Sequence, residues 1–195
     1  MSNALITEII DNVLIVRFNR PEIRSPLSIA VLNELDSILR QKSSAAAKWL
    51  VFTGTGNVFA SGADLREIAA VDGATAREFA IRGQSLFGLI ADRSDTTIAA
   101  VNGFCFGGAL DLALACGRRI ASPDAIFSHP GANLGIITGW GGTQRLPRLI
   151  GEANAIEMLF MAKRVTAPEA LAIGLIDAIA ADPLKAAVAL AGTDG

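Results

Sequence analysis

Short apolar blocks separated by polar residues fill the first part of the chain. Two runs, LITEII (5–10) and VLIVRF (13–18), flank an Asp-Asn pair with turn chemistry, which predicts a β-hairpin. Apolar residues then recur every fourth position over 27–39, which predicts a helix. The compact run WLVFTG (49–54) predicts a buried strand.

The middle of the chain alternates between strand and helix patterns. A glycine-rich loop over 54–62 leads into a predicted helix over 63–70, and a second helix is predicted over about 75–91. The run TIAAVNG (97–103) predicts an apolar strand that ends in an Asn-Gly turn. Glycines and helix-forming residues follow, so this part predicts a strand, a tight turn and a helix.

The last third repeats this order. A weak strand is predicted near 125–128, followed by a glycine-rich loop and three helical segments up to about residue 190. Neither an internal repeat nor an interdomain linker interrupts the pattern. Strands alternating with helices predict a single α/β domain over 1–195, with a sheet covered by helices.

Composition narrows the classes of partner. The chain has 195 residues, a formal net charge of -2 and a single histidine. This charge gives no basic surplus for nucleic acid or an anionic membrane, so we expect a small-molecule partner. Apolar runs stay short of the roughly 18 to 20 residues that span a bilayer, and the N-terminus lacks secretory features, which predicts a cytoplasmic protein. One histidine and two cysteines outside a C-x-x-C spacing predict no metal site and no disulfide framework.

The segment GFCFG (103–107) has two interpretations. In the first it is a nucleophile elbow, with Cys105 as nucleophile, His129 as base and Asp124 or Asp111 as the orienting acid. The phenylalanines on both sides of Cys105 offer nothing that stabilises a thiolate, and such a cysteine is usually a small core residue. A Cys105-dependent hydrolase is therefore the less favoured hypothesis.

The second interpretation starts from the glycines. If Gly107 and Gly108 open a helix, their N–H groups lack partners within that helix, and Gly62 and Ala63 stand at a similar junction. Two such N–H groups can hold the oxygen of a thioester as an enolate forms, and one donor can contribute roughly 3 to 4 kcal/mol. Asp111 follows about one helical turn later and can act as the acid/base. Alternatively, Asp111 only interacts with the helix dipole, a contribution of about 0.3 to 1 kcal/mol.

Three segments resemble one known family over nearly the whole chain. They are FTGTGNVFASGADLREI (52–68), AVNGFCFGGALDLALAC (100–116) and LGIITGWGGTQRLPRLIG (134–151). They resemble the crotonases, the enoyl-CoA hydratase/isomerase superfamily. The resemblance implies the α/β spiral of ββα units that crotonases share with ClpP, and an activity on acyl-CoA thioesters in fatty acid metabolism.

The resemblance also implies roles for individual residues. The N–H groups of Ala63 and Gly108 fall where the family forms its oxyanion hole, and Asp111 falls where hydratases carry a catalytic glutamate. Coenzyme A then enters as part of the substrate, with no separate cofactor, and a homo-oligomer is expected, either a trimer or a hexamer. The residues implied to lie near the substrate are Arg24, Gly62, Asp64, Leu65, Arg66, Gly107 and Gly131.

The chain departs from the family at a second carboxylate. Hydratases place a glutamate where this chain has Gly131, and hydration uses two carboxylates to hold a water and move a proton. One carboxylate is enough to move a proton between carbons, which favours a double-bond isomerase. His129 can partly substitute, because strand alternation would place it on the same face as residue 131. The open alternatives are a hydratase/isomerase, an isomerase only, and a non-catalytic acyl-CoA-binding homologue.

The chain also stops soon after AADPLKAAVALAG (180–192), where the family continues with further helices. We therefore expect a core over about 1–165 and a shortened C-terminal helical part over about 166–195. We expect the chain to be either a naturally short member of the family or a member that lacks the helices covering the site.

Overall fold

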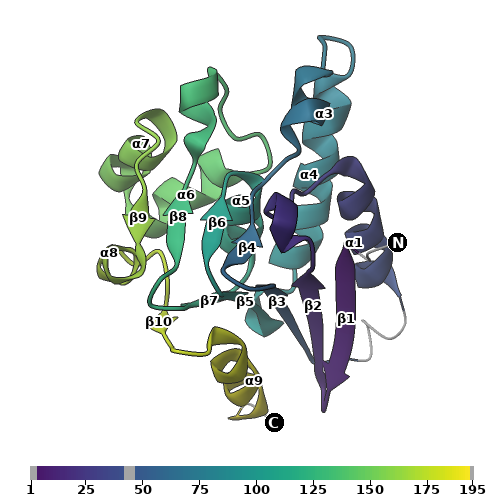
Figure 1. Cartoon of the computed structure of the whole chain (residues 1–195), viewed down its shortest axis with the longest axis vertical. Helices are drawn as coiled ribbons and strands as arrows, with labels where there is room; N and C mark the ends of the chain where they lie inside the picture. Colours follow the sequence, from purple (N-terminus) through teal and green to yellow (C-terminus); the bar gives the residue numbers. More distant parts are fainter. Residues whose placement is uncertain (1–3, 42–46, 194–195) are drawn as a thin grey trace.

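The computed structural model describes residues 4–41 and 47–193, and its strands form two sheets (Figure 1). Within these residues the larger sheet has the order β1-β2-β3-β5-β7-β10, and the smaller sheet has the order β4-β6-β8-β9. The strands are β1 (Leu5–Ile10), β2 (Val13–Phe18), β3 (Trp49–Gly54), β4 (Val58–Ala60), β5 (Thr97–Val101), β6 (Phe104–Phe106), β7 (Arg118–Ala121), β8 (Ile126–Ser128), β9 (Val165–Thr166) and β10 (Ala178–Ile179). The helices are α1 (Ile29–Arg40), α3 (Leu65–Ala69), α4 (Ala76–Ala91), α5 (Gly108–Ala115), α6 (Gly142–Ile150), α7 (Glu152–Phe160), α8 (Ala167–Ala172) and α9 (Pro183–Thr193), with 3-10 helices η1 (Pro21–Ile23), η2 (Ser94–Thr96) and η3 (Pro130–Leu134).

The predicted hairpin is confirmed. Strands β1 and β2 pair antiparallel, and their last pair joins Ile10 to Val13 across a two-residue turn. Asp11 adopts a φ of 52° in this turn, a left-handed conformation that aspartate and asparagine tolerate better than most residues. The Asp-Asn pair therefore sets the register of the first two strands.

Successive strands alternate between the two sheets. Strands β3, β5 and β7 are parallel in the larger sheet, and β4, β6 and β8, which follow them along the chain, are parallel in the smaller sheet. Parallel neighbours end at the same edge of a sheet. The segments that follow Ala60, Phe106 and Ser128 therefore lie side by side above β4, β6 and β8 (Figure 1). This edge is where α/β folds of this kind place their ligands.

Some predicted boundaries were wrong. The loop predicted over 54–62 contains β4, and β6 lies inside the predicted tight turn before α5. Strand β7 was not predicted. The three helical segments expected up to about residue 190 are four helices, α6 to α9, with two-residue strands β9 and β10 between them. Strands of two to four residues carry too little alternation to be detected from sequence.

The predicted helix over 27–39 begins two residues later. Ser28 caps α1, and its side-chain oxygen accepts a hydrogen bond from the Val31 N–H at 3.3 Å. Leu27 instead pairs with Ala63 as a parallel bridge, and its N–H donates to the Gly62 carbonyl at 2.7 Å. The start of α1 is therefore tied to the segment that follows β4.

Two apolar cores cover the two faces of the larger sheet. The main core lies between this sheet and α1, α4 and α5, and it includes Phe52, Phe87 and Leu110. On the other face, the strand residues pack against Ala187 and Ala191 of α9. Figure 1 shows α9 apart from the other helices, at the opposite end of the molecule from α3. The C-terminal helix therefore supports the sheet rather than the edge above β4, β6 and β8.

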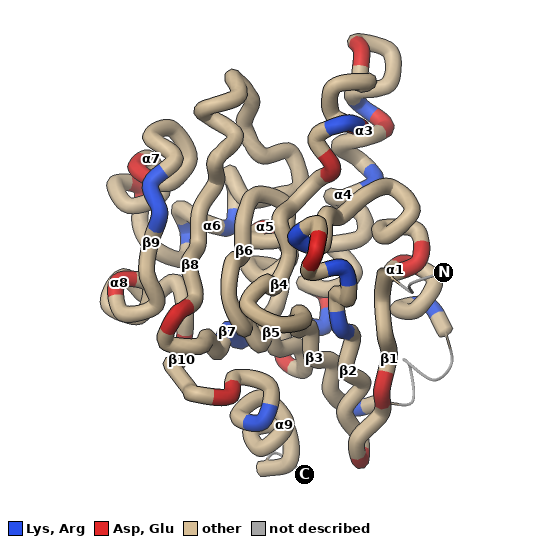
Figure 2. Tube along the Cα trace, in the orientation of Figure 1, with Lys and Arg blue, Asp and Glu red and all other residues tan. Residues whose placement is uncertain are grey.

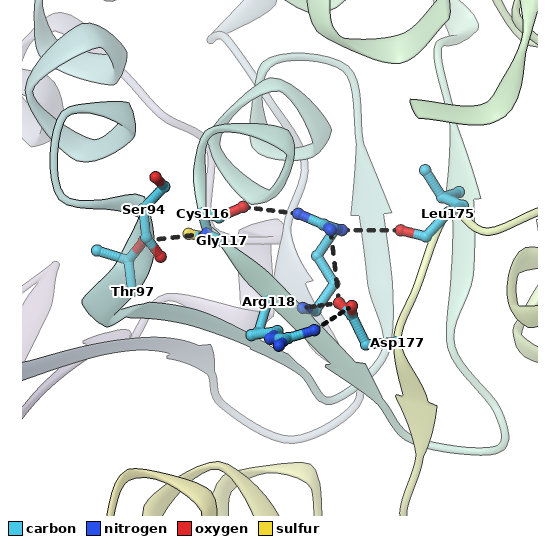
Figure 3. A network of polar contacts seen from close by, with 8 residues as sticks. Ser94, Thr97, Cys116, Gly117, Arg118, Leu175 and Asp177 are labelled. Carbon is cyan, nitrogen blue, oxygen red and sulfur yellow. Dashed lines mark hydrogen bonds and ion pairs between the residues drawn. The ribbon is translucent and has the colours of Figure 1, made fainter. Parts of the chain in front are cut away.

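A buried arginine, Arg119, fastens the segment before β10 to β7, and Figure 3 labels its partners Cys116, Leu175 and Asp177. Arg119 donates to the carbonyls of Cys116 at 2.6 Å and Leu175 at 2.9 Å, and it pairs with Asp177 at 3.4 Å. Asp177 also accepts from the backbone N–H of Arg119 at 2.8 Å. Because a buried charge is costly unless it is paired and hydrogen-bonded, these contacts stabilise the position of the C-terminal segment.

Candidate active site

A cavity of about 460 Å³ opens where β4, β6 and β8 end. One wall is formed by α3 and α4, with Leu65, Ile68 and Phe79, and the other by the segment after β8, with Leu134 and Ile137. Figure 2 shows that this second segment carries no charged residue, whereas charged residues gather on and around α3. The cavity therefore suits a ligand with an apolar portion.

Two glycines bring the loops after β4 and β6 into backbone contact. Gly62 has a φ of 84° and Gly107 a φ of 56°, both in the region that favours glycine. A β-carbon on Gly62 would lie 2.7 Å from the Gly108 nitrogen and 2.7 Å from the Phe106 oxygen. Only a residue without a side chain allows the two loops to approach this closely.

Two backbone N–H groups meet at this contact without an acceptor. Ala63 and Gly108 both line the cavity, and a β-carbon on Gly108 would lie 3.6 Å from the Ala63 nitrogen. Neither N–H donates to any residue that the structure describes. A pair of unpaired N–H groups at one point of a cavity can bind an oxygen atom that becomes negative during a reaction.

Asp111 lies one turn into α5, and its N–H donates to the Gly107 carbonyl at 3.1 Å. Its carboxyl group is fully buried, and the Thr138 hydroxyl donates a hydrogen bond to Oδ2. Burial raises the pKa of Asp111 to about 7, against the opposing effects of Thr138 and of the backbone N–H groups of Trp140 and Gly142. A carboxyl group with this pKa can both accept and donate a proton near neutral pH.

His129 lies beside Asp111. Its Nε2 is 3.4 Å from Asp111 Oδ1, and neither of these two buried atoms has a hydrogen-bond partner among the described residues. Burial lowers the pKa of His129 to about 4, so the imidazole is neutral at pH 7 and the contact is not an ion pair. His129 lines the cavity, and the fully buried Asp111 carboxyl lies against its ring, outside the cavity lining.

Gly131 lies in η3 rather than on a strand, so the expected strand alternation with His129 is wrong. Pro130 at the start of η3 ends the extended conformation after β8. His129 and Gly131 nevertheless both line the cavity. A β-carbon on Gly131 would lie 2.8 Å from the Ile136 carbonyl oxygen. The loop therefore leaves no room for a side chain at the position where the family resemblance places a glutamate.

The other residues predicted near the substrate divide into two groups. Leu65 and Gly107 line the cavity, but Asp64 and Arg66 do not. Arg66 Nη2 pairs with Asp64 Oδ2 at 2.7 Å, and this hydrogen-bonded contact lowers the pKa of Asp64 to about 2. Asp64 also caps α3 through the Arg66 N–H, so its carboxylate is engaged in local structure.

Gly62 and Arg24 lie next to the cavity without lining it. The loop that carries Arg24 runs beside the segment that follows β4, because the Ser61 N–H donates to the Ser25 carbonyl at 3.4 Å. Arg24 itself is exposed and has a φ of 62° at the end of η1. Arg24 thus precedes a residue that is hydrogen-bonded to the cavity-lining Ser61, and Arg66 follows the cavity-lining Leu65.

The hypothesis of a Cys105-dependent hydrolase is wrong, because it requires Cys105 to be an accessible nucleophile. Cys105 is completely buried in the main core, and burial raises the pKa of its thiol well above the usual value. Asp124 is exposed on the turn before β8. The thiol therefore cannot act as a nucleophile toward a ligand in the cavity.

Thr138 is the functional candidate that sequence reasoning missed. Its hydroxyl binds Asp111, 27 residues earlier in the chain. The only signal was its place in the segment LGIITGWGGTQRLPRLIG (134–151), which resembles the family. Trp140, two residues later, is buried and lines the cavity.

Within residues 4–41 and 47–193, no group of three or more His, Cys, Asp or Glu side chains is arranged to hold a metal ion. The helices in these ranges all fall short of the length and apolar character needed to cross a membrane.

Solved structures share this architecture. The enoyl-CoA hydratase of Bacillus anthracis superposes with a TM-score of 0.90 at 33% identity, covering 98% of this chain and 76% of that one. The enoyl-CoA hydratase of Thermoplasma volcanium gives a TM-score of 0.92 at 30% identity, covering 98% and 77%. The chain thus has the crotonase fold, as its sequence motifs predicted.

The family follows from sequence comparison. The family model described as Enoyl-CoA hydratase/isomerase matches residues 8–190. The crotonyl-CoA hydratase of Syntrophomonas wolfei is 38% identical over 90% of this chain and 68% of its own length, and the short-chain-enoyl-CoA hydratase of Clostridium acetobutylicum is 37% identical over 91% and 69%. The chain therefore belongs to the enoyl-CoA hydratase/isomerase family, and it spans about two thirds of the length of these relatives.

Proposed function

We propose that this chain is an enoyl-CoA hydratase/isomerase-type enzyme that moves protons at the carbon next to an acyl-CoA thioester. The observation that carries the proposal is the meeting of two unpaired N–H groups, from Ala63 and Gly108, one helical turn from a buried carboxyl group. The N–H groups hold the thioester oxygen as it becomes an enolate, and Asp111 takes the proton from the α-carbon. The apolar walls of the cavity bind the acyl group.

Asp111 performs both proton steps in this proposal. With its pKa near 7, about half of the carboxyl groups are ionised at neutral pH and ready to accept a proton. The protonated acid then returns this proton to another carbon of the enolate, which completes a double-bond shift. His129 Nε2 lies 3.4 Å from Asp111 Oδ1, and in this proposal it takes the part of the missing second carboxylate in hydration.

A panel of CoA thioesters separates the possible activities. The purified protein is incubated with 2-enoyl-CoA and 3-enoyl-CoA substrates, and the products are identified by mass spectrometry and NMR. Water addition identifies a hydratase, and interconversion of the two enoyl isomers identifies an isomerase. Binding of thioesters without either conversion, and without exchange of the α-proton, would contradict the proposal and leave a non-catalytic binder.

A substitution of Thr138 tests what sets the pKa of Asp111. The Thr138 hydroxyl stabilises the ionised carboxylate, so Thr138→Val should raise the pKa of Asp111 above about 7. Activity that depends on the carboxylate form should then rise with pH at a higher midpoint than in the parent. The measurement is the pH profile of kcat/KM, with Thr138→Ser as the matched control that keeps the hydroxyl. Identical profiles for the valine variant and the parent would show that this hydrogen bond does not tune the base.

The homo-oligomeric state and the cytoplasmic location stay predictions, as does the proximity of Arg24 and Arg66 to the coenzyme A part of the substrate. Charge reversal at either arginine, followed by measurement of thioester affinity, tests the last of these.

A further inference from the structure

The Trp140 indole fills the space between α4 and α5. It is 3% exposed, and both of its sides face glycines. A β-carbon on Gly83 of α4 would overlap the five-membered ring, and one on Gly108 of α5 would overlap the six-membered ring. The two glycines therefore leave a slot that the tryptophan side chain occupies completely.

The indole is also held in one orientation. Its Nε1–H donates to the Phe79 carbonyl at 3.3 Å. The Phe79 ring lies 5.4 Å from the indole, and the Phe87 ring meets it edge-on at 5.7 Å. Because the rings and the hydrogen bond fix its position, Trp140 forms a rigid wall rather than a movable side chain.

This wall stands beside the reacting atoms. The indole contacts Gly108, whose N–H is one of the two proposed oxyanion donors, and the backbone N–H of Trp140 acts on the Asp111 carboxylate. A carbon chain that leaves the reaction centre toward α4 and α5 therefore meets the indole at once. We infer that Trp140 limits the length of the acyl group, so that the enzyme takes short-chain acyl thioesters; the inference rests on the proposed function.

The test measures affinity for a series of saturated acyl-CoA thioesters, from butanoyl to decanoyl, by calorimetry. In the parent, affinity should stop rising after the first members of the series. In Trp140→Ala the vacated slot can accept further methylene groups, and each one that is buried should raise affinity about fourfold. The ratio of octanoyl-CoA to butanoyl-CoA affinity should therefore increase roughly 10- to 100-fold.

Two further variants keep the test decisive. Trp140→Phe removes less of the wall and should shift the same ratio by only about fourfold, and it remains informative if the alanine variant does not fold. Trp49→Ala is the matched control, because Trp49 is equally buried but packs in the other core, on the face covered by α9. It should leave the ratio unchanged.

The outcomes separate this inference from the proposed function. An unchanged ratio in a folded Trp140 variant, or a parent affinity that rises steadily to decanoyl-CoA, would overturn the inference whether or not the protein is an enzyme. A parent that binds thioesters without converting them would contradict the proposed function, while the affinities still decide the role of Trp140. Absence of binding to every thioester would overturn both.

Discussion

Gly62→Ala is expected to lower kcat/KM for an enoyl-CoA substrate about 100- to 1,000-fold, the cost typical of losing one oxyanion donor. The added β-carbon would lie 2.7 Å from the Gly108 nitrogen, and the φ of 84° at residue 62 disfavours any other residue. The two loops would have to separate, and the Ala63 and Gly108 N–H groups could no longer reach one oxygen. Steady-state kinetics on the purified variant measure the loss.

Gly56→Ala is the matched control. Gly56 also has a left-handed φ, 64°, but a β-carbon there would meet nothing within 4 Å. Both variants thus carry a similar backbone strain, and only Gly62→Ala disturbs the donors. Similar kinetics for the two variants would mean that the loop contact is not part of the catalytic geometry.

Asp111→Asn is expected to reduce turnover about 100- to 10,000-fold, because the amide keeps the shape of the side chain but cannot accept the α-proton. The same change should stabilise the folded protein at alkaline pH. The folded-state pKa of Asp111, about 7, lies above its unfolded value, so the folded state binds more protons between these two values. Stability supplied by the parent carboxyl is therefore present below the unfolded pKa and lost as pH rises toward 7.

The rise in the pKa of Asp111 sets the size of this stabilisation. A pKa raised from its usual value to about 7 corresponds to up to about 4 kcal/mol of lost stability at pH 8, and the neutral amide of Asn avoids this loss. Denaturant unfolding of parent and variant at pH 4 and pH 8 measures it, with the exposed Asp124→Asn as control. An Asp111→Asn variant that retains parental activity, or that is less stable than the parent at pH 8, would contradict this account of the residue.

The sequence singled out candidate site residues more readily than the elements that position them. Gly62, Gly108 and Asp111 were recognisable because tight turns and helix starts have strong local requirements. Strands β4 and β6, which bring them together, are three residues long and are stabilised by neighbours from other parts of the chain. Their pairing is not local, so no pattern along the chain reveals it.

The features of the site that the sequence did not predict depend on contacts between residues far apart in the chain. Neither the hydrogen bond from Thr138 to Asp111 nor the 3.4 Å approach of His129 leaves a trace in residue spacing. The shift in the pKa of Asp111 depends mainly on burial, which needs the packed structure. Arg66 illustrates the reverse case, because a basic residue beside a predicted binding loop turns out to be paired with Asp64.

The measurement that most directly tests the central claim is exchange of the α-proton. The protein is incubated with a saturated acyl-CoA in deuterated water at a series of pH values, and deuterium entering the α-carbon is followed by NMR. The account predicts incorporation that rises with pH, has a midpoint near pH 7 and is lost in Asp111→Asn. Tight binding of the thioester without incorporation at any pH, or parental exchange by Asp111→Asn, would contradict it.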